Sequence, residues 1–144
     1  MAAIKQTLNV VSYNLHGFNQ GKIVIEDLLQ STDIFLLQEH WLTPANMSRL
    51  DNTFCDFFCI GRSAMSDRVQ IGMLTGRPFE GAAILIHNRL RPVTKTVTCD
   101  DRYVIVQVAS YLFISIYMPC VGTNDRLLLF NELCYLRFGF GVNV

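Results

Sequence analysis

The chain has 144 residues, of which 51% are hydrophobic and 17% charged, so its composition is that of a globular domain and excludes a disordered segment. Lys plus Arg and Asp plus Glu both number 12, which gives a formal net charge of zero. Because non-specific affinity for nucleic acid comes largely from an excess of Lys and Arg, this balance argues against broad electrostatic binding of DNA or RNA.

The first part of the chain predicts strands that alternate with short helices. Runs rich in β-branched and aromatic residues predict strands over 8–13, 34–38 and 54–60. In the first of these, Val10 and Val11 are typical of a buried position. Residues 22–30 carry apolar side chains at helical spacing. Pro44 predicts the start of a second, short helix that ends near Leu50, because proline is tolerated in the first helical turn.

The second part predicts an exposed loop and then strands in succession. Residues 61–78 lose all periodicity and are expected to form the loop. Further strands are predicted over 81–87, 93–99, 103–108 and 111–117. Either Thr123 or Asn124 is expected to cap a helix over 126–136, and 137–144 is expected to be a divergent tail. This order of elements predicts an α/β domain with a mixed sheet.

The cysteines and the amino-terminal sequence bear on the cellular compartment. Five cysteines without a CxxC pair or a Cys/His ligand spacing predict free, buried thiols in a reducing environment, with Cys55 and Cys59 in core packing. No apolar run reaches the roughly 18 residues that a membrane span needs. The first ten residues contain no apolar signal-peptide region. We therefore expect a nuclear or cytoplasmic protein that is neither secreted nor inserted in a membrane.

Two of the apolar runs are each closed by a polar residue, Asn14 in the first and Glu39 in the second. A polar group at the end of a buried strand lies at the mouth of a packed layer, where α/β proteins tend to build sites. A carboxylate beside Trp41 is costly to bury unpaired, and Mg²⁺ offsets that cost because it takes oxygen ligands and often only one or two carboxylates. Alternatively, Glu39 is solvated beyond the strand end or caps a backbone amide.

Asn14 and Tyr117 also have two interpretations each. Asn14 either holds a phosphate oxygen or orients a metal ligand, or it belongs to a turn, since asparagine shortly before glycine is common in turns. Tyr117 ends the last predicted strand, where its phenol either hydrogen-bonds a phosphate or lies in the partly buried core. His16, His40 and His87 show no ligand spacing, and no role is predicted for them.

Five tracts in order resemble the endonuclease/exonuclease/phosphatase superfamily: VVSYNLHGF, IFLLQEHWL, RPFEGAAILIHN, DRYVIVQV and ISIYMPC. They are most similar to the endonuclease domain of LINE-type (non-LTR) retrotransposon reverse transcriptases, relatives of apurinic/apyrimidinic endonucleases and deoxyribonuclease I. The resemblance runs from Leu8 to about Leu133 and covers the amino-terminal part of the family domain. It implies that 1–136 is a truncated deoxyribonuclease-I-like α/β sandwich with mixed, largely antiparallel sheets flanked by helices.

The resemblance also implies roles for three residues. Asn14 matches the asparagine that helps to hold the scissile phosphate and the metal site. Glu39 matches the glutamate that is a direct ligand of Mg²⁺, for which Mn²⁺ can substitute. Tyr117 matches the tyrosine beside the phosphate. The implied reaction is metal-assisted hydrolysis of a DNA phosphodiester.

The chain departs from the family pattern in three respects. It contains no GDFN-like tract, which in the family positions the nucleophilic water, and no later Asp-His pair; Asn124 and Asp125 stand in an NDR context without the strand and glycine of that tract. Glu80 occupies a position where relatives often carry glycine, which predicts a disturbed start of the next strand. Since a general base and several ligands each contribute orders of magnitude in rate, we expect little or no nuclease activity.

Two other functions remain open. The fragment is either a non-catalytic interaction module, which binds a partner protein or a second copy through the apolar face meant for the missing sheet, or a phosphoesterase that acts on another phosphodiester. The QEHW and YMPC tracts favour the retrotransposon branch.

Overall fold

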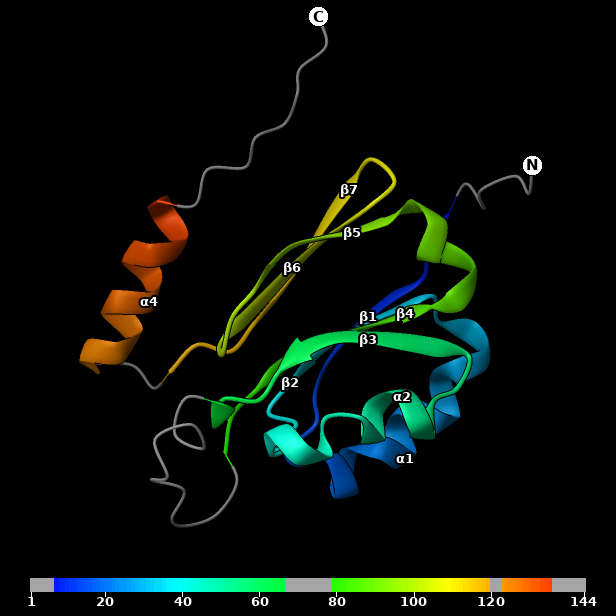
Figure 1. Ribbon diagram of the computed structural model, residues 1–144, viewed down its shortest axis with the longest axis horizontal. Coiled ribbons are helices and arrows are strands. Elements are labelled where there is room, and N and C mark those ends of the chain that lie inside the picture. The colour runs from blue at the N-terminus through cyan, green and yellow to red at the C-terminus, as the bar shows by residue number, and fades with distance from the viewer. Residues whose placement is uncertain (1–6, 67–78, 120–122, 136–144) are drawn as a thin grey trace, which may run out of the picture.

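In the computed structural model, the described residues, 7–66, 79–119 and 123–135, form two β-sheets that pack face to face (Figure 1). The first sheet has the order β1-β2-β4-β3 and the second the order β5-β6-β7. The strands are β1 (Val10–Asn14), β2 (Ile34–Gln38), β3 (Phe57–Arg62), β4 (Ala82–His87), β5 (Thr94–Cys99), β6 (Tyr103–Val108) and β7 (Tyr111–Ile116). The helices are α1 (Phe18–Leu28), α2 (Arg49–Thr53) and α4 (Asn124–Tyr135), with short 3₁₀ turns η1 (Leu29–Ser31), η2 (Pro44–Asn46) and η3 (Asn88–Val93).

The first sheet is mixed and the second is antiparallel. β1 runs parallel to β2, and β4 pairs antiparallel with both β2 and β3. β5, β6 and β7 form an antiparallel meander. The predicted α/β class with a mixed sheet is confirmed, and the strands over 34–38 and 103–108 agree with the prediction residue for residue.

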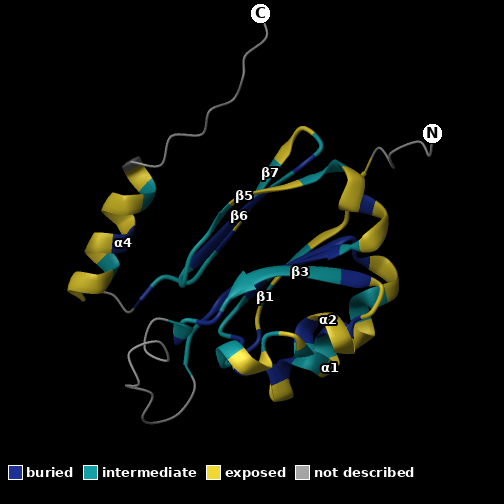
Figure 2. Ribbon diagram, in the orientation of Figure 1, coloured by how far each residue is buried: buried dark blue, intermediate teal, exposed yellow. Residues whose placement is uncertain are grey.

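Three apolar clusters hold these layers together, and Figure 2 shows the buried residues along the inner strands. α1 and α2 cover the outer face of the first sheet, where Phe18, Ile25 and Leu50 pack against β2 and β4. The two sheets meet across Ile84 and Ile86 of β4 and the valines of β6. Leu129 of α4 packs on the outer face of the second sheet against Tyr103 and Ile105 of β6, so β6 is covered on both faces.

Several predicted boundaries were wrong for local reasons. α1 begins at Phe18, four residues earlier than predicted, and its Gly21 leaves room for Leu15, whose atoms a Cβ would overlap. The helix predicted from Pro44 is a 3₁₀ turn followed by the separate helix α2. β3 runs on to Arg62, inside the predicted loop; 67–78 lie outside the described residues, as does the tail at 137–144.

Val10 is 40% exposed, contrary to the prediction, because only one face of β1 is covered. Val11 and Tyr13 pack under the helices, whereas the opposite face of this edge strand is exposed. The large hydrophobic side chains exposed among the described residues are spread over five elements and do not form one sheet face: Val10, Ile23, Val97, Tyr111, Ile114, Leu127, Leu128 and Phe130. Binding of a partner through an apolar sheet face therefore stays a prediction.

Cys55, Cys59, Cys99 and Cys134 are free thiols, as predicted, although Cys134 is exposed and not buried as expected. Cys55 is exposed, however, so its assignment to core packing was wrong: it lies in the turn between α2 and β3, whereas Cys59 lies within β3. None of the helices in the described part of the chain is long and apolar enough to cross a membrane.

Candidate active site

The structure places Glu39 and Tyr117 at the same end of the two sheets. Glu39 follows β2 directly and Tyr117 follows β7 directly, and β7 packs across from β2. Both side chains line one cavity of about 680 Å³. Asn14 ends β1 opposite Gln38, one residue before Glu39, but it does not line that cavity.

His16 connects Asn14 to Glu39. The His16 backbone N–H donates to Asn14 Oδ1 at 3.0 Å, and the His16 Nδ1 lies 3.3 Å from Glu39 Oε2. The Glu39 side chain is 17% exposed and that of His16 is 72% exposed. Two predicted site residues are thus joined through one residue of the loop after β1. No role was predicted for His16, because only its position two residues after β1 could have indicated one.

The loop after β1 and the segment after β2 are fixed to each other by backbone hydrogen bonds. The N–H groups of Leu15, Gly17 and Phe18 donate to the carbonyls of Gln38, Glu39 and His40 at 2.8–2.9 Å. Left-handed backbone gathers at the same place, although it is rare for residues other than glycine: His16, Glu39, Trp41 and Glu80 all have φ between 50° and 54°. Such strained residues persist where surrounding contacts over-determine them, and they cluster at functional sites.

Glu80 has a φ of 52°, a value that glycine adopts without strain. β4 nevertheless begins two residues later at Ala82, paired with both Gln38 and Arg62. The predicted disturbance of the strand is therefore absent. The Glu80 carbonyl accepts a hydrogen bond from the Trp41 N–H at 3.0 Å, which helps to hold the segment that follows Glu39.

His40 lies directly after Glu39 and is fully buried. Its Nδ1 accepts from the Leu42 N–H at 3.0 Å, so its Nε2 carries the proton that is donated to the Arg62 carbonyl at 3.1 Å. Burial lowers the pKa of His40 from its ordinary 6.5 to about 4, although the bond to Arg62 opposes the shift. Gly81 has a φ of 99° and leaves the space that the imidazole fills. His40 is therefore a neutral internal brace for Glu39, a role that ligand spacing could not signal.

A second brace joins the two sheets beneath the cavity. The hydroxyl of Ser115, which is 1% exposed, donates to the Leu37 carbonyl at 2.9 Å and accepts from Gln38 Nε2 at 2.9 Å. Ser115 lies two residues before Tyr117, and Gln38 lies one residue before Glu39. We call these two hydrogen bonds of Ser115 the Ser115 clasp. Because they join β7 to β2, they fix the position of Tyr117 relative to Glu39.

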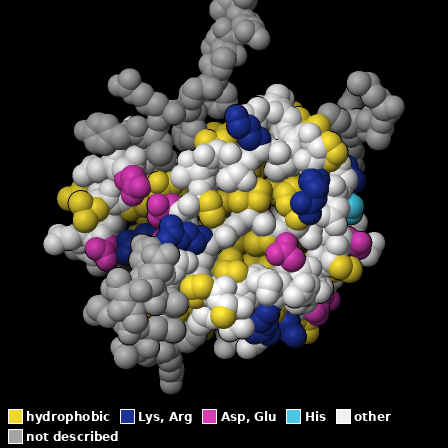
Figure 3. All heavy atoms as spheres, viewed as in Figure 1, with side chains coloured by type: hydrophobic (Ala, Val, Ile, Leu, Met, Phe, Trp, Pro, Cys, Tyr) yellow, Lys and Arg dark blue, Asp and Glu magenta, His cyan; other side chains and the backbone are white. Residues whose placement is uncertain are grey.

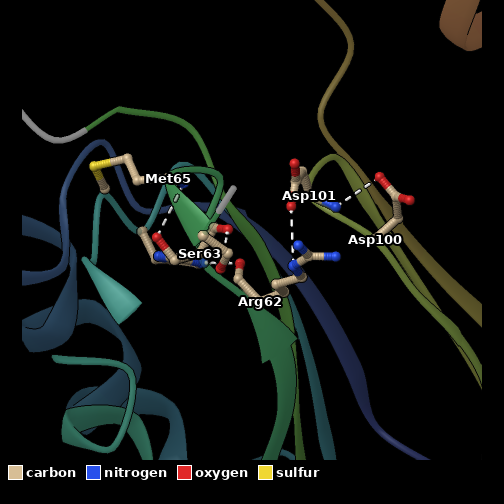
Figure 4. Close-up of polar contacts among 7 residues, drawn as sticks. Arg62, Ser63, Met65, Asp100 and Asp101 are labelled. Atoms are coloured by element: carbon tan, nitrogen blue, oxygen red, sulfur yellow. Dashed lines mark hydrogen bonds and ion pairs between the residues drawn. The ribbon is translucent and has the colours of Figure 1, made fainter. Parts of the chain in front are cut away.

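Two arginines extend this support. Arg62, whose carbonyl holds His40, places its Nε 3.2 Å from the Oδ1 of Asp101 in the turn after β5 (Figure 4). Arg102 accepts the Tyr117 N–H through its carbonyl at 2.8 Å, and its side chain reaches Glu80 at 3.6 Å and Asp125 at 3.3 Å. The carbonyl of each arginine accepts a hydrogen bond within its own sheet, and the guanidinium forms an ion pair with a neighbouring element. These ion pairs connect the elements at the site end of the sandwich. Elsewhere, the Lys and Arg side chains on the face viewed in Figure 3 are scattered and form no basic patch.

The donor atoms fit Mg²⁺ in kind but are few. Glu39 offers a half-buried carboxylate, and Asn14 offers an amide oxygen that already accepts one hydrogen bond. Nowhere in the described ranges do three His, Cys, Asp or Glu side chains gather closely enough to hold a metal ion. Mg²⁺ is often bound through one or two carboxylates together with water and substrate phosphate, so one carboxylate suits an ion that binds with its substrate.

The two-sheet sandwich flanked by helices has the deoxyribonuclease-I-like fold, as solved structures show. An AP endonuclease from Archaeoglobus fulgidus superimposes with a TM-score of 0.60 at 16% identity, over 88% of this chain and 49% of that one. The 3′ phosphatase NExo (D146N) from Neisseria, bound to a product DNA hairpin, gives 0.58 at 14% identity, over 88% and 48%. The 3′-5′ exonuclease NExo from Neisseria meningitidis gives 0.57 at 14% identity, over 85% and 49%.

This chain spans about half the length of these three structures. No protein-family model and no curated protein matches the sequence. At this level of identity the likeness establishes the fold alone.

Proposed function

We propose that this chain is the amino-terminal part of a Mg²⁺-dependent DNA endonuclease domain of the retrotransposon type. In this proposal Glu39 holds the metal ion, Asn14 helps to hold the scissile phosphate and the metal site, and Tyr117 lies beside the phosphate. The observation that carries the proposal is that Glu39 and Tyr117, which are far apart in the sequence, line one cavity at one end of the sandwich.

In this proposal each residue has a chemical task. Mg²⁺, or Mn²⁺ in its place, supplies a Lewis acid for the phosphoryl oxygen and the leaving oxyanion. The left-handed backbone conformation of Glu39 and the contact of its carboxylate with His16 fix the orientation of that carboxylate. The Tyr117 phenol is a hydrogen-bond donor suited to a phosphate oxygen. Trp41, which follows Glu39 by two residues, is half-buried and lines the same cavity.

Metal binding by Glu39 can be tested with Mn²⁺ as a paramagnetic probe. Trp41, the single tryptophan of the chain, provides one indole N–H resonance close to the site. We expect Mn²⁺ to broaden this resonance in the natural protein and in Glu26→Gln, which removes an exposed carboxylate on α1, but not in Glu39→Gln. Equal broadening in Glu39→Gln would show that Glu39 is not the metal ligand.

We also propose that these 144 residues alone do not cleave DNA, because the sequence contains neither the GDFN-like tract nor the Asp-His pair. The test is conversion of supercoiled plasmid to open circles with Mg²⁺, next to Glu39→Ala. We expect no nicking above that of the variant. Nicking that disappears in Glu39→Ala would refute the proposed inactivity while supporting the role of Glu39.

The alternatives make different predictions in the same assays. A phosphoesterase for another phosphodiester would retain the Glu39-dependent Mn²⁺ effect but would cleave a substrate other than DNA, with release of an alcohol and a phosphomonoester. An interaction module would show no Glu39-dependent effect. A GDFN-like tract and a reverse transcriptase in the nucleotide sequence that follows this coding region would favour the retrotransposon assignment.

A further inference from the structure

The cavity that holds Glu39 and Tyr117 is also lined by residues with no role in the proposed chemistry. They lie on α1, in η2 and the residue before it, and at the start of α2: Phe18, Asn19, Gln20, Thr43, Asn46 and Arg49. The cavity volume of about 680 Å³ falls in the range, roughly 300–1,000 Å³, in which proteins enclose small ligands. The space therefore extends beyond what one metal ion and one phosphate fill.

Arg49 is the one Lys or Arg among the described residues that line this cavity. Its guanidinium carbon lies 4.7 Å from the centroid of the Phe18 ring, and its Nη2 donates to Asn19 Oδ1 at 2.8 Å. Phe18 is 3% exposed and packs edge-on against Phe54, so the platform under Arg49 is fixed. An arginine held this way has lost its rotamer freedom before a ligand arrives, and its planar fork keeps donors for a phosphate.

Trp41 provides an apolar surface in the same cavity. One side of its indole packs on Gly17, where a Cβ would lie 2.8 Å from Trp41 Cε3, and on the His16 ring at 5.0 Å. A large aromatic residue with a φ of 54° is a strained choice for a merely structural position. Half-exposed aromatic rings next to cations are the elements with which proteins bind single-stranded nucleic acid, since every base has a face that stacks.

From these contacts we propose that Arg49 binds a backbone phosphate of the DNA strand next to the scissile phosphate, and that Trp41 packs against the intervening nucleotide. This inference rests on the proposed function. Arg49, Trp41 and Glu39 line one cavity, so one bound strand can contact all three. Because the net charge of the chain is zero, its affinity for DNA comes from individual contacts such as these and not from an overall excess of positive charge.

Arg91 provides a matched control elsewhere on the surface. Its guanidinium lies 4.1 Å from the Phe58 ring centroid, and its Nη2 lies 3.3 Å from Asn88 Oδ1. The arrangement repeats that of Arg49, namely an arginine stacked on phenylalanine and bound to an asparagine amide, but Arg91 does not line the cavity. Arg91→Gln therefore removes the same charge and the same kind of contacts without touching the proposed subsite.

The experiment titrates the protein with an oligothymidylate of about ten nucleotides in EDTA and follows both the fluorescence of Trp41 and the anisotropy of a labelled strand. We expect quenching of Trp41 on binding. Arg49→Gln should weaken binding by about tenfold and lower the salt dependence, d log K/d log[salt], by about 0.7. Arg49→Lys should keep that salt dependence, since the charge remains, and Arg91→Gln should change neither quantity.

Three results would overturn the inference. The first is equal loss of affinity in Arg49→Gln and Arg91→Gln. The second is anisotropy-detected binding without quenching of Trp41, which would place the strand elsewhere. The third is no binding at all. None of them decides the proposed function, because Glu39-dependent broadening by Mn²⁺ is measured without DNA; failure of that test with intact Arg49-dependent binding would overturn the metal site and leave a nucleic-acid subsite.

Discussion

Acid should destabilise this protein in part through His40. The imidazole is fully buried next to Glu39, with its Nδ1 bonded to the Leu42 N–H and its Nε2 to the Arg62 carbonyl. Burial lowers its pKa from 6.5 to about 4. Between these two values the unfolded chain binds a proton at His40 and the folded chain does not, so the free energy of unfolding falls as the pH falls.

The size of the effect follows from the two pKa values. One unit of pKa difference corresponds to about 1.4 kcal/mol, so the shift of His40 sets a limit of about 3 kcal/mol, reached below its folded pKa of about 4. Between about pH 7 and about pH 5 we expect a loss of about 2 kcal/mol. Above its ordinary pKa of 6.5 the contribution of His40 should be constant, because the residue is then neutral in both states.

The assay is urea denaturation of the natural protein and of His40→Gln, both in EDTA, at several pH values across this window. The variant is expected to be less stable at neutral pH, because it leaves the Arg62 carbonyl or the Leu42 N–H without its partner. All other titrating groups are common to both proteins, so the difference between the two stability curves isolates His40. Parallel curves from about pH 7 to about pH 5 would refute the claim that His40 is buried in its neutral form.

Two further predictions concern the clasp between the sheets and the thiols. Ser115→Ala removes both hydrogen bonds of a buried hydroxyl and should lower the free energy of unfolding by about 1–3 kcal/mol. The control Ser110→Ala, in the exposed turn before β7, should change it little. Equal effects of the two substitutions in urea denaturation would contradict the role of the Ser115 hydrogen bonds. Cys55 is exposed and should react quickly with a disulfide reagent. Burial, together with nearby Asp51, raises the pKa of the Cys59 thiol and should keep it unreactive in the folded protein. Comparable labelling of both cysteines, measured by mass spectrometry, would contradict the packing of β3.

The sequence alone predicted the strands best where the fold covers both faces. The strand over 34–38 lies in the interior of the first sheet and that over 103–108 in the interior of the second, so each begins with at least four successive apolar residues and is easily recognised. The prediction that Val10 is buried was wrong, because the sequence does not distinguish an apolar residue on the uncovered face of an edge strand from a buried one. The start of α1 was missed because glycine at position 21 lowers helix propensity, while packing against Leu15 requires it.

Some residues of the candidate site could likewise be predicted from the sequence, and others could not. Glu39 and Tyr117 were found because each stands directly after a recognisable strand, and the structure brings them to one cavity. The residues that support them, His16, His40 and Ser115, gave no signal. Their roles depend on hydrogen bonds across 22 to 78 positions of sequence or on a loop conformation, and neither leaves a local pattern.

The pairing of β4 has a consequence for the order in which the chain folds during synthesis. β2 and β3 are both made before β4, yet each of them finds its antiparallel neighbour only in β4, which lies between them (Figure 1). The first sheet therefore cannot close until His87 has left the ribosome, whereas β5, β6 and β7 pair with sequence neighbours and can close as they emerge. Until then the apolar edges of β2 and β3 are open to other chains, so the nascent protein should depend on chaperones most strongly just before β4 is complete.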